Sequence, residues 1–110
     1  MNKVKDMNFG DVVESSTKIR RLYHKLEKQY HGKEWTVEED ALAFLTDAGL
    51  VGRLTMSQQE HWPKGGDTIS ELEHKLAECI WWLVVLADRM NINISEALKM
   101  FLSKTEKQLE

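Results

Sequence analysis

The sequence has few of the residues that restrict a chain covalently or conformationally. Its 110 residues include one cysteine, Cys79, and one proline, Pro63. A single cysteine excludes an internal disulfide, so we expect a protein that works in a reducing compartment, the cytoplasm. The proline lies with two glycines in SQQEHWPKGGD, residues 57–67, and this composition predicts the main loop of the chain.

Basic charge and long apolar runs are also scarce. Fifteen Lys and Arg stand against 18 Asp and Glu, for a net charge of -3. Nucleic-acid binding needs a basic surplus that neutralises phosphates, so we expect no nucleic-acid partner. The longest apolar run, Cys79 to Ala87, has nine residues, whereas a bilayer span needs roughly 20. The N-terminal MNKVKDMNFGDVV holds no signal-like apolar stretch, and we expect no membrane partner.

Apolar residues do not alternate with the period of two that marks strands. They recur at spacings of three and four, which is typical of amphipathic helices. The spacing predicts four helices, at about Phe9 to Tyr30, Thr36 to about Met56, Thr68 to about Met90, and Asn93 to Leu109. We therefore expect an all-α fold, a four-helix bundle formed by a single domain over residues 1–110.

The predicted helix starts carry capping residues. In a capping box, an N-terminal side chain and an acidic one three residues later each accept a free backbone N–H. The pairs that fit are Thr36 with Glu39, Thr68 with Glu71, and Asn93 with Glu96. The first helix is expected to end at residues 31–32, where a glycine follows a histidine.

The second and third helices are too apolar to be covered within one short chain. From Cys79 to Ala87 the third helix is apolar on every side. Such a helix must be covered on every side, so we expect a homodimer or a tetramer built from it. Gly49 and Gly52 weaken the second helix by roughly 1 kcal/mol each relative to Ala, which predicts the close approach of another helix.

Asp47 is an acidic residue on an apolar part of the second helix, in LTDAGLVGRL, residues 45–54. A buried carboxylate neutralises, pairs with a cation, or binds a metal such as Mg²⁺. Lys75 and Arg53 are the candidate cations. Glu78 occupies a comparable place on the third helix, at the inner end of a polar stripe, and could pair with Lys75 three residues earlier.

Two segments resemble the MazG-like all-α nucleotide pyrophosphohydrolases. LAFLTDAGLVGRLTM, residues 42–56, resembles their L-x-x-E-x-G-E-L segment. HKLAECIWWLVVLADRMNINISEAL, residues 74–98, resembles their E-L-x-D-x-L-x-x-L-x-x-L-A run with the following I-D-L-x-x-A-L. The resemblance covers the chain from about Trp35 onward. It implies hydrolysis of a nucleoside triphosphate to monophosphate and pyrophosphate, with Mg²⁺ held by an E-x-x-E and an E-x-x-D pair on two facing helices.

The chain departs from that metal pattern at two of four positions. The first pair falls on Asp47 and Leu50, and the second on Lys75 and Glu78. Two interpretations follow. In the first, Asp47 and Glu78 hold Mg²⁺ and Lys75 contacts phosphate, so that these three residues are catalytic. In the second, the Lys75 ammonium stands where the metal would, and a non-catalytic MazG-like dimer binds a nucleotide or a protein partner. Both imply a MazG-like bundle completed by dimerisation.

Other polar and aromatic residues leave alternatives open. Asp40, Glu71 or His74 could substitute for the missing ligands. Trp81 and Trp82 are adjacent on a helix, so at most one could stack on a base, and the other would be core or dimer interface. The basic residues of the first helix form either a solvated face or a contact for a triphosphate. They are Lys18, Arg20, Arg21 and Lys25.

Overall fold

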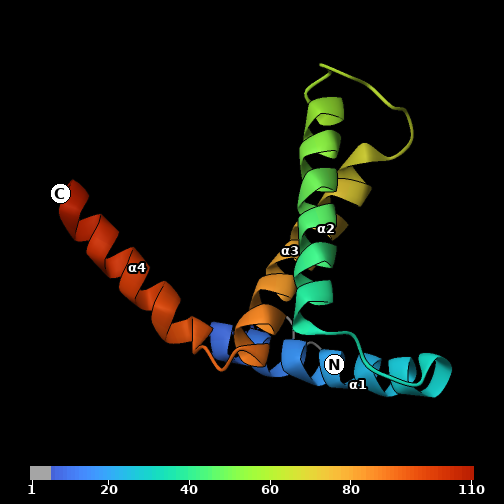
Figure 1. Cartoon of the computed structure of the whole chain (residues 1–110). Coiled ribbons are helices and arrows are strands. Elements are labelled where there is room, and N and C mark those ends of the chain that lie inside the picture. The colour runs from blue at the N-terminus through green and yellow to red at the C-terminus, as the bar shows by residue number, and fades with distance from the viewer. Residues whose placement is uncertain (1–5) are drawn as a thin grey trace. The chain divides into compact units, whose positions relative to one another are not determined.

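A computed structural model describes residues 6–110 and contains four α-helices (Figure 1). They are α1 at Phe9–His31, α2 at Val37–Gln58, α3 at Thr68–Arg89 and α4 at Ile94–Leu109. Residues 6–110 include no strand, so the predicted all-α class is confirmed. Every helix bound agrees with its sequence prediction to within two residues. None of the helices described is long and apolar enough to cross a membrane.

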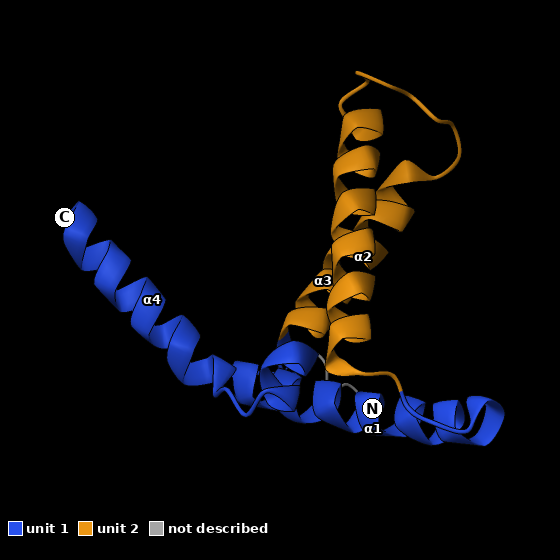
Figure 2. Cartoon of the chain, in the orientation of Figure 1, with its two compact units in different colours: residues 1–34, 84–110 blue, residues 35–83 orange. Residues whose placement is uncertain are grey.

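The chain divides into two compact units (Figure 2). Unit 1 combines residues 1–34 with residues 84–110, and unit 2 is residues 35–83. Unit 1 therefore contains α1, α4 and the last turns of α3, whereas unit 2 contains α2, the following loop and most of α3. Each unit has its own packing and its own polar contacts.

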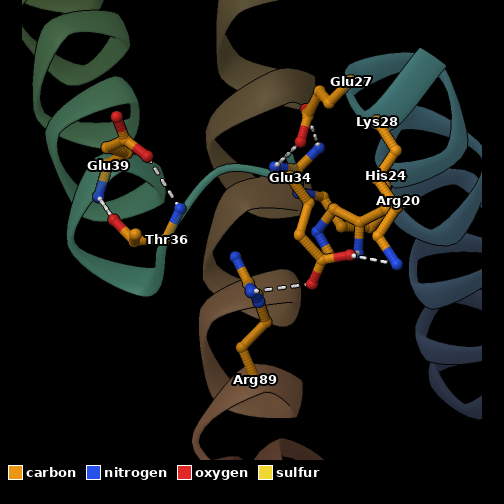
Figure 3. Close-up of polar contacts among 8 residues, drawn as sticks. All are labelled: Arg20, His24, Glu27, Lys28, Glu34, Thr36, Glu39 and Arg89. Carbon is orange, nitrogen blue, oxygen red and sulfur yellow. Dashed lines mark hydrogen bonds and ion pairs between the residues drawn. The ribbon is translucent and has the colours of Figure 1, made fainter. Parts of the chain in front are cut away.

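Local capping bonds fix most helix ends. Thr36 Oγ1 accepts the Glu39 N–H at 3.1 Å, and Glu39 Oε1 accepts the Thr36 N–H at 2.8 Å (Figure 3). Asn93 Oδ1 accepts the Glu96 N–H at 3.0 Å. The predicted capping box at Thr36 is confirmed, and at Asn93 the N-cap bond is confirmed. The end of α1 is confirmed as well, because Gly32 adopts φ +78°, a left-handed conformation that glycine takes at little cost.

The predicted capping pair of Thr68 with Glu71 is wrong. Asp67 caps α3 instead, since its Oδ1 accepts the Ser70 N–H at 3.1 Å. The Thr68 hydroxyl lies 3.4 Å from the Ser57 hydroxyl, and Glu71 pairs with a lysine of the loop. Asp and Thr are both good N-caps, so the local pattern could not choose between neighbouring residues. The sequence prediction also missed the capping box that Asn8 forms with Asp11 at the start of α1.

A network of ion pairs joins the elements of unit 1 (Figure 3). Arg20 is buried, and its guanidinium donates to both oxygens of Glu27, at 2.8 and 3.4 Å. Arg20 is thus neither on a solvated face nor in reach of a triphosphate, which corrects the sequence interpretation for this residue. Glu34 lies 3.6 Å from Arg89 Nη2 and 3.7 Å from Lys28 Nζ. Its carboxylate therefore links the end of α1 to the end of α3.

His24 lies inside this network with a buried ring nitrogen. Its Nε2 has no hydrogen-bond partner among the described residues, and its Nδ1 is 3.7 Å from Glu34 Oε2. Burial, followed by the charge of Arg20, lowers the pKa of His24 below the ordinary 6.5. The imidazole is therefore neutral at pH 7, and its contact with Glu34 is not a charged pair there.

Few apolar side chains are buried in either unit. Among the described residues, Leu54 and Trp82 are buried in unit 2, and Val84, Val85 and Ala87 in unit 1. No residue of α4 is buried. Within the run from Cys79 to Ala87, predicted to need cover on every side, Ile80 and Leu83 remain 54% and 47% exposed. The chain therefore leaves much apolar helix surface in water.

The lowered pKa of His24 predicts acid sensitivity of the fold. Unfolded His24 takes up a proton near pH 6.5, whereas the folded residue resists it, so the free energy of unfolding falls as pH drops through that value. We expect the urea midpoint of the wild type to fall between pH 7.5 and 5.5, and to fall less for His24→Gln. His31 is exposed, so His31→Gln is the control, and its urea midpoint should fall by as much as that of the wild type. An equal loss in His24→Gln would contradict the assignment.

Candidate functional site

Helices α2 and α3 form an antiparallel hairpin in unit 2 that brings Asp47, Lys75 and Glu78 together. The Lys75 ammonium donates to Asp47 Oδ1 at 2.9 Å and to Glu78 Oε1 at 3.0 Å. Lys75 and Glu78 are neighbours on α3 because residues three apart share a helix face, and Asp47 meets them from α2. The pairing of both carboxylates with Lys75 was one of the alternatives left open by the sequence, and it is confirmed.

Trp82 completes the environment of Asp47. Its indole Nε1 donates to Asp47 Oδ2 at 2.9 Å, and both residues are buried. Each carboxylate oxygen of Asp47 thus has an internal donor. The Trp82 ring also packs against Trp81 at 4.6 Å between centroids, tilted by 58°. Of the two tryptophans, Trp82 is therefore the core residue. Its ring is buried and hydrogen-bonded to a carboxylate, so it is not available to stack on a nucleotide base.

The charge state of this cluster follows from its hydrogen bonds. The hydrogen bond that Lys75 donates to Asp47, and after it the bond that it donates to Glu78, raises the pKa of Lys75, and together they outweigh the opposing effect of burial. Lys75 is consequently charged at every physiological pH. Two carboxylates and one ammonium leave a net charge of about -1. This donor set does not suit Mg²⁺, which prefers an octahedron of oxygen ligands and dense negative charge.

Of the other candidate ligands, Glu71 has another partner and His74 lies beside Glu78. Asp40 is fully buried, at 0% exposure. Glu71 pairs with Lys64 at 3.2 Å, and the largely exposed His74 ring approaches Glu78 only to 3.6 Å. Within residues 6–110, no three His, Cys, Asp or Glu side chains form a group that could hold a metal ion. A shifted four-carboxylate site is therefore not assembled.

Arg53, the other cation considered for Asp47, is held elsewhere in unit 2. Its Nη1 donates to the Trp62 carbonyl oxygen at 2.7 Å, and its guanidinium lies 4.1 Å from the centre of the Trp62 ring. The sequence analysis predicted neither this cation–π contact nor the bond from Trp82 to Asp47. Each joins residues from different elements, and helical periodicity carries no signal for such a pairing.

A cavity of about 460 Å³ adjoins the Lys75 cluster. Its walls come from α2, the loop and α3, and all of them belong to unit 2. The lining residues are Leu50, Arg53, Leu54, Lys64, Ser70, Glu71, His74 and Lys75. Leu50 and Lys75, where the sequence differs from the acidic pairs of the family that it was said to resemble, both line this cavity.

Comparisons of the chain with protein-family models, with curated proteins and with solved structures find no match.

The geometry predicts that Asp47 contributes more to stability than Glu78. Asp47→Asn keeps an acceptor for Trp82 but removes the charge that Lys75 binds, and should lower the free energy of unfolding by about 2 kcal/mol. Glu78→Gln should cost less than about 1 kcal/mol, as for other partly exposed pairs within a helix. Urea unfolding at one fixed chain concentration measures both. Equal losses, or a larger one for Glu78→Gln, would contradict this ranking.

Proposed function

We propose that the chain is a non-catalytic MazG-like helical domain, which forms a homodimer and binds a nucleotide or a protein partner without cleaving it. One observation carries the proposal: the Lys75 ammonium lies between Asp47 and Glu78, 2.9 and 3.0 Å from their oxygens. A fixed positive charge between the two remaining carboxylates supplies the neutralisation that a cation would otherwise provide.

Displacing Lys75 from these carboxylates would be costly. To bind both carboxylates, a metal ion would have to break the two charged hydrogen bonds of Lys75 and the hydrogen bond from Trp82 to Asp47, or coordinate free lone pairs beside these bonds. Such bonds contribute on the order of 1.5–3 kcal/mol each. The ion would also meet the repulsion of the ammonium at close range. These costs favour a metal-free site.

The second candidate is the enzyme implied by the resemblance, a nucleoside triphosphate pyrophosphohydrolase that uses Mg²⁺. It is favoured by the convergence of Asp47 and Glu78 from two facing helices. In this reading Lys75 would swing away from the carboxylates and contact a phosphate. The two candidates differ in whether the wild-type chain binds a divalent cation.

Metal binding separates these candidates. We expect calorimetry with Mg²⁺ or Mn²⁺ to detect no binding to the wild type, and nucleoside triphosphates to release no pyrophosphate. The double variant Leu50→Glu/Lys75→Glu restores four carboxylates and should bind Mn²⁺ measurably. Leu50→Gln/Lys75→Gln is the matched control without added charge. Tight binding of either ion by the wild type, or pyrophosphate release that Asp47→Asn abolishes, would establish the enzyme instead.

Dimerisation is supported by an exposed stripe on α2. Its members follow one another at spacings of three and four, as in the seam of a coiled coil. They are Leu42, Leu45, Gly49, Gly52 and Met56, and all are exposed. The two leucines expose 63% and 65% of their surface. A side chain added at Gly49 or Gly52 would meet no atom of residues 6–110 within 4 Å. None of these described residues therefore provides the close helix approach that the sequence predicts.

A charge in this stripe should dissociate the dimer. We expect sedimentation equilibrium to give a dimer for the wild type and a monomer for Leu45→Glu, because a carboxylate in an apolar interface loses its hydration. Thr46→Glu is the control, since the neighbouring exposed residue lies outside the stripe, and it should remain dimeric. A monomeric wild type, or a dimeric Leu45→Glu, would count against a second copy on this face.

A further inference from the structure

The cavity beside the Lys75 cluster has the dimensions of a ligand site. Its volume of about 460 Å³ lies within the roughly 300–1,000 Å³ that is usual for small-molecule pockets. Leu50 and Leu54, one turn apart on α2, give it an apolar wall, and Leu54 is only 4% exposed. An apolar or aromatic body could therefore lose its hydration there.

Cations from three elements surround this apolar wall. Arg53 comes from α2, Lys64 from the loop and Lys75 from α3. Against these three charges the lining offers one carboxylate, Glu71, although the whole chain has a net charge of -3. Asp47 and Glu78, which lie outside the lining, offset the charge of Lys75 through their hydrogen bonds with it. The positive charge that faces the cavity therefore comes chiefly from Arg53 and Lys64, and it favours an anion.

The three cations keep donors available for a ligand. Arg53 is oriented by its bond to the Trp62 carbonyl and by the ring beneath it, and that bond uses one of the five N–H donors of a guanidinium. The bonds of Lys75 to Asp47 and Glu78 use two of its three N–H groups. The Lys64 ammonium pairs with Glu71, at 3.2 and 3.5 Å between partly exposed side chains, so an anion can compete for it.

We propose that this cavity binds a phosphate monoester carried on an apolar body, directly through Arg53, Lys64 and Lys75 and without a divalent metal. Donors that approach from two helices and a loop suit a group with three terminal oxygens. Leu50 and Leu54 would contact the body of the ligand. The inference deepens the proposed function and rests on it in one respect, namely that no metal mediates the binding.

The test uses phenyl phosphate as probe, with the full chain in EDTA. Backbone amide shifts in two-dimensional NMR should change at the cavity, around residues 50–54, 62–64 and 70–75. Phenol, which lacks the anion, and inorganic phosphate, which lacks the apolar body, should each bind at least about tenfold more weakly. These three probes separate the contributions of charge and of apolar contact.

Single variants identify the cations that bind. Arg53→Gln and Lys64→Gln should each weaken the binding of phenyl phosphate by about tenfold, the usual loss for one charge-assisted hydrogen bond. Lys104→Gln removes one exposed cation from α4 and should leave affinity unchanged. Because Lys64 lies in an exposed loop, its variant should fold even if Arg53→Gln does not.

The outcomes separate this inference from the proposed function. Shifts confined to the cavity, together with both losses, support the inference. If phenyl phosphate does not bind in EDTA, the inference is overturned. If binding then appears on addition of Mg²⁺, the proposed metal-free function is overturned as well. If Mg²⁺ has no effect, the proposed function stands, but phosphate monoesters are not its ligand. Equal affinity for phenol and phenyl phosphate, or unchanged affinity in Lys64→Gln, overturns the inference as well.

Discussion

The two hydrogen bonds of Lys75 are the interaction on which the hairpin of α2 and α3 depends. Asp47 lies on a helix face that is otherwise apolar, and a carboxylate buried there without a partner would cost several kcal/mol. Lys75 and Trp82 satisfy its two oxygens from the facing helix. Because both donors must reach one residue, they also fix which turns of α3 lie against which turns of α2.

The same hydrogen bonds determine which side chains line the neighbouring cavity and what charge they carry. Lys75, held by the carboxylates, lines the cavity from α3, while Leu50 supplies apolar surface on the opposite helix. A family pattern built to collect divalent cations would place acidic groups at both positions. In this chain Leu50 is apolar and Lys75 is positive, which is why the ligand we propose is an organic anion rather than a metal ion.

The exposed apolar surface limits how much stability a single copy of the chain can gain from burial. The described residues bury five apolar side chains, whereas every residue of the α2 stripe is exposed. Burial of apolar area is the main favourable term in folding. Helices that leave their apolar faces in water therefore gain little free energy from this term. Association with a second copy would recover this term, and the two glycines would allow close helix contact.

Helix positions were predictable because they depend on local rules. Apolar spacing and the caps at Thr36 and Asn93 placed the bounds within two residues, since each rule operates within one turn of helix. The prediction failed at Thr68, where adjacent Asp67 offers the same chemistry. It also failed at Arg20, which a run of basic residues suggested to be solvated, because its partner Glu27 lies two turns away on the same helix.

The sequence by itself determined the all-α class, the four helices and the need of Asp47 for a compensating partner. Only the tertiary structure decided that the partners are Lys75 and Trp82, and that Arg53 instead stacks on Trp62. The physical reason is that helical periodicity records which residues share a face of one helix. It does not record which turn of another helix, 28 or 35 residues away, comes within 3 Å.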